Sequence, residues 1–136
     1  TMTELMQAKI DTHWEGIEAL GGKLHLDRII TGSMKKGVGA EIFMDEPSVT
    51  ATENLLLLAV KCEGTTTLHN AACEPHVAGL CKLLVKMGAK IEGIGGDTLT
   101  IHGVARLSGA RHRVVADRIE AGTFVIAGAT ITAAMM

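Results

Sequence analysis

Pro47-Ser48-Val49-Thr50 is a segment that could bind an anion, because it precedes an apolar run and should form the first turn of a helix. Such a turn offers unpaired backbone N–H groups, two hydroxyls and the positive end of the helix dipole, all of which attract phosphate. The same residues also suit an ordinary helix cap, since Ser and Thr are preferred at that position. Spacing alone favours capping and leaves an anion site as the alternative.

Asp11-Thr12-His13 opens a second predicted helix. The Asp11 carboxylate could cap this helix, or it could accept a hydrogen bond from an N–H group or a ribose hydroxyl of a ligand. Capping is again the simpler interpretation, and the residues themselves leave both roles open.

The cysteines lack the spacing of a metal site. Cys62, Cys73 and Cys81 form no Cys-x-x-Cys pair, and His69 and His76 between them form no His-x-x-x-His pair. An odd number of cysteines without a framework is typical of free thiols in a reducing compartment. We therefore expect neither a metal centre nor a disulfide.

Cys73-Glu74-Pro75-His76 could supply acid–base groups, because a carboxylate and an imidazole meet at a predicted junction of strand and helix. Glu74 and Pro75 also suit the first turn of a helix. Nothing in the sequence pairs a nucleophile with an oriented base, so we expect no complete catalytic site in this chain.

Apolar periodicity places these segments in a βαβαββ unit. The unit comprises strand 40–44, helix 48–62, strand 65–70, helix 74–87 and a hairpin of strands 90–93 and 98–102. A capping box, Thr50-x-x-Glu53, should open the first helix, and Gly64 and Gly88 should end the two helices. The predicted fold class is α/β (α+β).

Two landmarks recur about 70 residues apart, which indicates a repeat. Leu20-Gly21-Gly22-Lys23 returns as Met87-Gly88-Ala89-Lys90, and the strand end at 40–45 returns at 112–117. We therefore expect about two units in one partial domain: the tail of a preceding unit at 1–36 (helix 11–20 and strand material 23–31), a complete unit at 37–104, and the head of a following unit at 105–136 (strand 113–116 and a helix from about 119). Since the chain should begin and end inside repeat units, we expect it to be an internal fragment. Segment 129–133 is the spare stretch with strand propensity.

Composition excludes several classes of function. The 136 residues carry a net charge of -2 and only 2% aromatic side chains, which disfavours nucleic-acid binding. The apolar stretch 124–136 is shorter than the ~17 to 25 residues that a membrane helix needs, and the N-terminal residues do not resemble a secretory signal. We expect a soluble, cytoplasmic protein that binds neither nucleic acid nor membrane.

Several segments, in this order and spacing, carry a resemblance that covers nearly all of residues 8–129. They are Ile10-Asp11-Thr12-His13, Ser48-Val49-Thr50-Ala51-Thr52, Glu63-Gly64-Thr65-Thr66-Thr67, Asn70-Ala71-Ala72 with Glu74-Pro75, Met87-Gly88-Ala89-Lys90-Ile91, and Asp117-Arg118-Ile119-Glu120. Together they resemble the UDP-N-acetylglucosamine 1-carboxyvinyltransferase family, the enolpyruvyl transferases of peptidoglycan synthesis. The sister enzymes of aromatic-acid synthesis share the βαβαββ repeat but not the Asp11-x-His13 helix.

The resemblance implies an inside-out α/β barrel of βαβαββ units. It implies transfer of enolpyruvyl from phosphoenolpyruvate to the 3-hydroxyl of UDP-N-acetylglucosamine, without a cofactor, in the first committed step of peptidoglycan synthesis. Asp117 and Arg118 match the crossover to the second half of that fold. By the same match, the substrate-contacting residues are Ile10, Asp11 and Thr12 at the uridine and Ser48, Val49 and Thr50 at the nucleotide.

This chain also departs from the family pattern. Ala8-Lys9 stands where the family has Arg-Pro, and Glu46-Pro47 stands where a basic residue is frequent. The family's reactive cysteine loop, its Lys-Asn pair and the arginines of its far half have no match here. The resemblance therefore implies no catalytic residue in this chain, no turnover by it alone, and weak nucleotide binding.

The alternative interpretation is a free-standing, non-enzymatic βαβαββ module that binds a partner or a nucleotide. Incomplete units would leave sheet edges and apolar helix faces uncovered, so we also expect this chain to self-associate.

Overall fold

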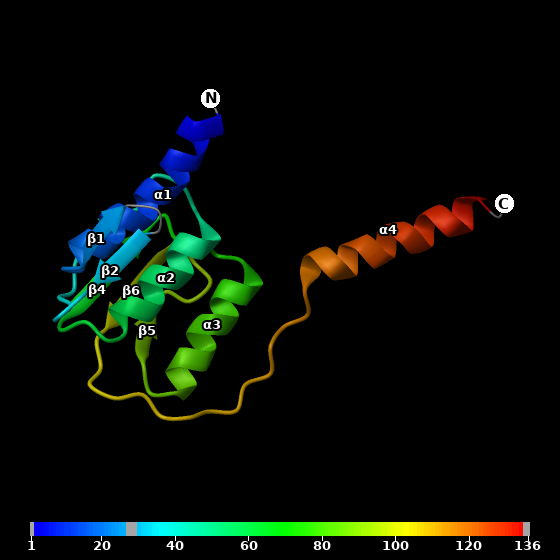
Figure 1. Ribbon diagram of the computed structural model, residues 1–136. Helices are drawn as coiled ribbons and strands as arrows, with labels where there is room; N and C mark the ends of the chain where they lie inside the picture. The colour runs from blue at the N-terminus through cyan, green and yellow to red at the C-terminus, as the bar shows by residue number, and fades with distance from the viewer. Residues whose placement is uncertain (1, 27–29, 135–136) are drawn as a thin grey trace.

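The computed structural model describes residues 2–26 and 30–134 and confirms the predicted α/β class (Figure 1). The elements are, in order, α1 (Met2–Ala19), β1 (Lys23–Leu26), β2 (Ile30–Ser33), β3 (Glu41–Phe43), α2 (Val49–Ala59), β4 (Thr65–His69), α3 (Pro75–Lys86), β5 (Lys90–Glu92), β6 (Thr98–His102) and α4 (Arg118–Ala134). From β3 to β6 the elements follow the predicted βαβαββ order.

A four-stranded sheet with the order β3-β4-β6-β5 forms the centre of the molecule. β3 and β4 are parallel and are connected through α2, as a parallel pair requires a crossover. β6 pairs antiparallel with both β4 and β5. β1 and β2 form a separate antiparallel pair.

The core lies between one face of this sheet and the helices α2 and α3. Leu68 on β4 and Leu99 on β6 are opposite each other in the register and are both buried. The buried apolar side chains that meet there include Ile42, Leu55, Leu56, Cys81, Leu84 and Ile101. Fully burying one such aliphatic side chain contributes about 1.5–3 kcal/mol, so this layer fixes α2 on the sheet.

α1 lies close to α2 because Gly16 has no side chain. A Cβ atom at Gly16 would lie 2.5 Å from Cδ2 of Leu55. Thr12 on the same helix is also buried. The contact therefore brings the middle of α1 next to the beginning of α2.

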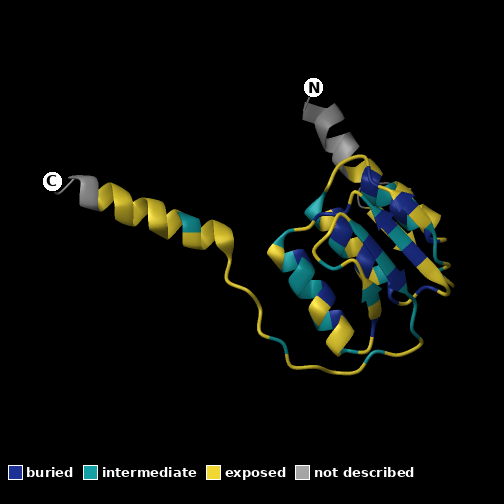
Figure 2. Ribbon diagram, turned by 180° about the vertical axis from the view of Figure 1, so that it is seen from behind, coloured by how far each residue is buried: buried dark blue, intermediate teal, exposed yellow. Residues whose placement is uncertain are grey.

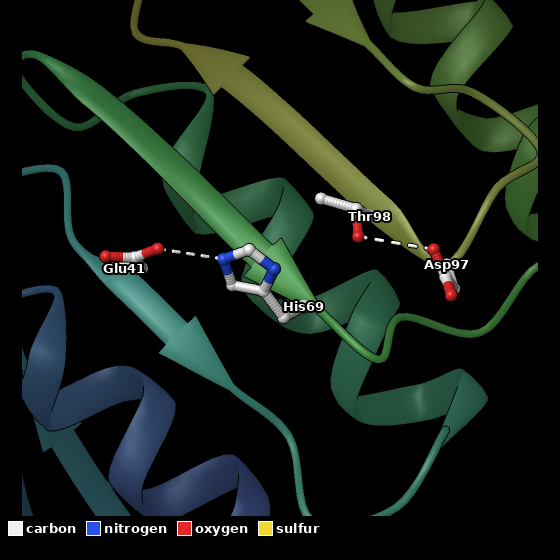
Figure 3. Close-up of polar contacts among 4 residues, drawn as sticks. All are labelled: Glu41, His69, Asp97 and Thr98. Carbon is white, nitrogen blue, oxygen red and sulfur yellow. Dashed lines mark hydrogen bonds and ion pairs between the residues drawn. The ribbon is translucent and has the colours of Figure 1, made fainter.

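The opposite face of the sheet is open to solvent. On this face His69 of β4 lies beside β3, and its Nε2 atom is 2.9 Å from Oε1 of Glu41 (Figure 3). At the start of β6, Thr98 donates a hydrogen bond to the Asp97 carboxylate at 3.2 Å. Side chains that alternate between buried and exposed along the strands explain this division.

Gly88 follows the end of α3 as predicted, with a φ angle of 105° that only glycine adopts without strain. The prediction that Gly64 ends the first helix is wrong, because α2 ends at Ala59 and Val60 is its C-cap; Gly64 has a φ angle of 88° in the turn before β4. The predicted capping box at Thr50 and Glu53 is wrong, because Ser48 is the N-cap of α2 and its Oγ accepts a hydrogen bond from the Ala51 N–H at 3.4 Å. Ser48 is the last residue with extended backbone, so its oxygen reaches the third N–H of the helix.

α1 begins at Met2, earlier than the predicted start at residue 11. Residues 4–9 are good helix formers, so nothing in the sequence stops the helix from extending toward the N-terminus. Asp11 therefore lies inside α1 and is exposed, and it does not cap the helix.

The predicted strand at 113–116 is wrong: these residues form no regular element, and Val114 and Val115 are 78% and 46% exposed beside a hollow that α3 also borders. The spare stretch with strand propensity, 129–133, belongs to α4. The helix predicted from about residue 119 is confirmed as α4, which projects away from the rest of the molecule after an extended segment (Figure 1).

No helix in the part of the chain that the structure describes is long and apolar enough to cross a membrane.

Candidate functional site

A hollow of about 400 Å³ lies where α1 meets the first turn of α2. Its lining residues are His13, Glu46, Pro47, Ser48 and Thr50. The two segments that the sequence singled out, 37 residues apart at His13 and Thr50, therefore border the same hollow.

The first turn of α2 presents hydrogen-bond donors to this hollow. Ser48 caps the Ala51 N–H, whereas the N–H groups of Val49 and Thr50 have no acceptor within the helix. The hydroxyls of Ser48 and Thr50 are 3.5 Å apart. These groups, with the positive end of the helix dipole, can hold an acceptor oxygen such as a carbonyl or a phosphate.

Glu46 adds a carboxylate among the lining residues. It repels an anion, so a phosphate there needs a compensating cation. The side chain of Lys9, the nearest basic residue before Asp11 in the sequence, lies outside the described residues.

His13 connects the two helices. Its Nε2 atom is 3.3 Å from Oγ1 of Thr50, and its Nδ1 atom is 3.3 Å from Nδ2 of Asn54. Asn54 is not predicted as a site residue from the sequence, and His13 is named there only within a segment that resembles the family. The spacing of Thr50 and Asn54 is a signal that could have found this pair, because residues four apart share one face of a helix.

The predicted site residues differ in their surroundings. Ile10 and Asp11 are exposed on α1, and Thr12 is only 6% exposed. Val49 is half-buried at the start of α2. Among the described residues, those lining the hollow include Ser48 and Thr50 but not the four residues just named.

A second hollow, of about 420 Å³, lies between the start of α3 and the segment before α4. It is lined by Pro75, His76 and residues 114–119, and its lining is mostly apolar. Glu74 approaches Arg118 here, with 3.9 Å between Oε1 and Nη2. The acid–base junction that the sequence suggested therefore lies beside the start of α4.

Asp117 is the cap of α4. Its Oδ1 accepts hydrogen bonds from the N–H groups of Ile119 at 2.8 Å and Glu120 at 3.2 Å. These backbone donors hold the pKa of the Asp117 carboxyl below its usual value. The carboxylate is therefore engaged by the backbone of α4.

The three thiols are free, and they differ in exposure. Burial raises the pKa of Cys62 and raises that of Cys81 to about 11, so both remain protonated near neutral pH. Cys73 is exposed, at the junction before α3. Within residues 2–26 and 30–134, no three His, Cys, Asp or Glu side chains are grouped as a metal site would need.

Comparisons with known proteins agree with this fold. The profile of the EPSP synthase (3-phosphoshikimate 1-carboxyvinyltransferase) family matches residues 6–135. Two similar proteins, from Treponema denticola and Treponema pallidum, are each named UDP-N-acetylglucosamine 1-carboxyvinyltransferase and are 48% identical to this chain over 117 residues. The match covers 86% of this chain and 28% of each relative, so the chain spans about a quarter of their length.

Solved structures of related enzymes match this fold. The enolpyruvyl transferase NikO from Streptomyces tendae matches with a TM-score of 0.74 and 25% identity, over 87% of this chain and 31% of that one. EPSP synthase from Acinetobacter baumannii matches with a TM-score of 0.61 and 13% identity, over 73% of this chain and 23% of that one, which shows a shared fold. This chain belongs to the EPSP synthase (3-phosphoshikimate 1-carboxyvinyltransferase) family.

Proposed function

We propose that this chain forms the nucleotide-holding part of a UDP-N-acetylglucosamine 1-carboxyvinyltransferase. Such an enzyme moves the enolpyruvyl group of phosphoenolpyruvate onto the 3-hydroxyl of UDP-N-acetylglucosamine and releases phosphate, at the start of peptidoglycan synthesis. The observation that carries the proposal is the 48% identity to two relatives of that name over 117 residues. The family profile alone also fits the sister enzyme of aromatic-acid synthesis.

The proposed substrate contacts are Ile10, Asp11, Thr12, Ser48, Val49 and Thr50. Support comes from the hollow at the start of α2, where Ser48 and Thr50 offer hydroxyl donors and the helix offers free N–H groups. The exposed carboxylate of Asp11 on α1 also supports these contacts, because it can accept a hydrogen bond from a ribose hydroxyl. The burial of Thr12 fits a role in holding α1 in place.

We assign no catalytic residue to this chain. Protonation of the enol carbon, attack by the sugar hydroxyl and loss of phosphate need a general acid and cations around the phosphates. Cys62 and Cys81 are buried and protonated, and Cys73 does not line the hollow near His13. We therefore expect no phosphate release from phosphoenolpyruvate by this chain alone.

Titration of the ¹⁵N-labelled chain with UDP-N-acetylglucosamine tests the proposal. We expect weak binding with shifted amide signals around Asp11 and Ser48, because one side of a cleft lacks the preorganisation that gives high affinity. Phosphoenolpyruvate alone is the matched control and should leave these amides unmoved. Shifts confined to the hollow beside α4, or no shift at all, would contradict a nucleotide site here. Submicromolar affinity or measurable turnover would contradict the proposal that this chain holds only one part of the substrate site.

A second candidate is a non-enzymatic module that binds a partner, including another copy of itself. α4 favours it, since Ile119, Phe124, Val125 and Ile126 are each 70–72% exposed (Figure 2). An exposed apolar helix of this kind is typical of an interaction surface.

We also propose that residues 37–104 are one repeat unit flanked by parts of two others, and that the protein acts in the cytoplasm. The free thiols support a reducing compartment.

A further inference from the structure

The geometry points to His13 as a positioning residue that makes the Thr50 hydroxyl a hydrogen-bond donor to the nucleotide. The inference rests on the proposed function, because it concerns the same hollow. It assigns His13 and Asn54 a role there in addition to the contacts proposed above.

Asn54 determines the tautomer of His13. Its Nδ2 atom, 3.3 Å from Nδ1 of His13, belongs to an amide NH₂ group that can only donate. Nδ1 must therefore accept, and neutral imidazole carries its single proton on Nε2. Nε2 in turn donates to Oγ1 of Thr50, 3.3 Å away.

The Thr50 hydroxyl proton then needs an acceptor. Thr52 and Thr123 donate to the carbonyls four residues earlier, of Ser48 and Ile119, each at 2.8 Å. Thr50 is the second residue of α2, so the carbonyl four residues earlier precedes the helix. Its hydroxyl is thus not tied to its own helix in the way that the other two are.

Ser48 is a poor acceptor for this proton. Its Oγ is 3.5 Å from Oγ1 of Thr50, at the limit of a hydrogen bond, and it already accepts from the Ala51 N–H. Two acceptors remain in the hollow: the Glu46 carboxylate, which also lines it, and an oxygen of a bound ligand. The hydrogen bonds from Asn54 to His13 and from His13 to Thr50 therefore leave the Thr50 hydroxyl as a donor that a carbonyl or phosphate oxygen of the nucleotide can accept.

Two substitutions of His13 separate its two nitrogens. His13→Gln places an amide NH₂ near the position of Nε2 and keeps the donor to Thr50. His13→Asn places an amide oxygen near the position of Nδ1, which keeps the contact to Asn54 and loses that donor. We expect UDP-N-acetylglucosamine affinity about tenfold weaker in His13→Asn and close to wild type in His13→Gln.

Thr50 supplies the second half of the test. Thr50→Val should weaken binding as much as His13→Asn, Thr50→Ser should not, and the double variant His13→Asn/Thr50→Val should be no weaker than Thr50→Val alone. Equal affinity of His13→Asn and His13→Gln would overturn the inference, and so would additive losses in the double variant.

The tautomer is measured without any ligand. Imidazole ¹⁵N shifts of His13 at mildly alkaline pH should show the proton on Nε2, and a proton on Nδ1 would overturn the inference. If the wild-type chain shows no nucleotide-induced shift, the proposed function fails. The tautomer then decides the positioning role by itself. A proton on Nδ1 of His13 would overturn that role. A proton on Nε2 in wild type, with an Nε2 signal that shifts in Thr50→Val, would support the hydrogen bond from His13 to Thr50.

Discussion

The imidazole ring of His69 stacks on the phenyl ring of Phe43, with 4.2 Å between the ring centroids and 11° between the ring planes. The two residues are register partners on β4 and β3. Glu41 contacts the same imidazole at 2.9 Å (Figure 3). The short edge strand β3 is thus held on β4 by side chains of the open face as well as by backbone hydrogen bonds.

Replacing Phe43 tests the contribution of this stack. Phe43→Ala should lower the free energy of unfolding by about 1 kcal/mol, the magnitude of an aromatic pair. The control is the same substitution in the His69→Ala background, where the stacking partner is absent and the loss should be smaller. Urea denaturation followed by circular dichroism measures the two single variants and the double variant. An equal loss from Phe43→Ala with and without His69 would show that the stack contributes nothing.

Two glycines should respond to alanine in opposite directions. A Cβ atom at Gly39 would lie 2.2 Å from the backbone oxygen of Thr65, so Gly39→Ala should destabilise the fold by about 2 kcal/mol. Gly79 lies inside α3, where an added methyl group would meet no atom within 4 Å, so Gly79→Ala should stabilise the fold by about 0.5–1 kcal/mol. Thermal melting of both variants checks the signs, and a lower melting temperature for Gly79→Ala would contradict the second.

The buried thiol of Cys81 should make the protein less stable in alkali. Burial raises its pKa from 9.0 to about 11, so the unfolded chain loses the proton first as pH rises. The protonated thiol therefore contributes fully to the free energy of unfolding below about pH 9, and this contribution is lost between pH 9 and about 11. Denaturation midpoints across this range should fall more steeply for wild type than for Cys81→Ala. Cys73→Ser, which changes the exposed thiol, should keep the wild-type slope.

Much of the fold is readable from the sequence because local signals agree with it. Gly88 predicts the end of α3 from the conformation that only glycine adopts easily. Errors arise where tertiary pairing decides: residues 113–116 have strand propensity but form no regular element, and Val114 and Val115 are exposed. Propensity alone contains no information about whether a partner strand is within reach.

In the candidate site, too, local sequence signals identify some residues and only the structure identifies others. Ser48 and Thr50 are detectable because hydroxyls before an apolar run mark the start of a helix. The contact of His13 with Thr50 joins two helices, and it depends on the close approach that Gly16 allows. Such a contact has no local sequence signature, so it requires the structure.

Asp117 should control the helicity of α4 through its charge. Its pKa is lowered by the N–H groups of Ile119 and Glu120, so its contribution is present above the unfolded pKa near 3.8 and is lost as pH falls through the folded value. Helical circular dichroism should therefore fall in acid more for wild type than for Asp117→Asn, which accepts the same hydrogen bonds without titrating. Asp117→Ala should be less helical at neutral pH. Identical acid profiles for wild type and Asp117→Asn would disprove this assignment.

Self-association through α4 is the remaining expectation, and it follows from the side chains on that helix. Residues 121–134 carry no charge, and Phe124, Val125 and Ile126 are each at least 70% exposed. Fully burying one such side chain contributes about 1.5–3 kcal/mol, so a few of them against a second copy suffice for micromolar association.

Sedimentation of the 14.3 kDa chain at micromolar concentration should show a dimer or larger species. Phe124→Asp should weaken association at least tenfold, because it would place a charge in the buried contact. Phe43→Asp adds the same charge to the open sheet face and should leave association unchanged. A monomer at all concentrations would refute self-association, and equal weakening by both substitutions would place the contact elsewhere than α4.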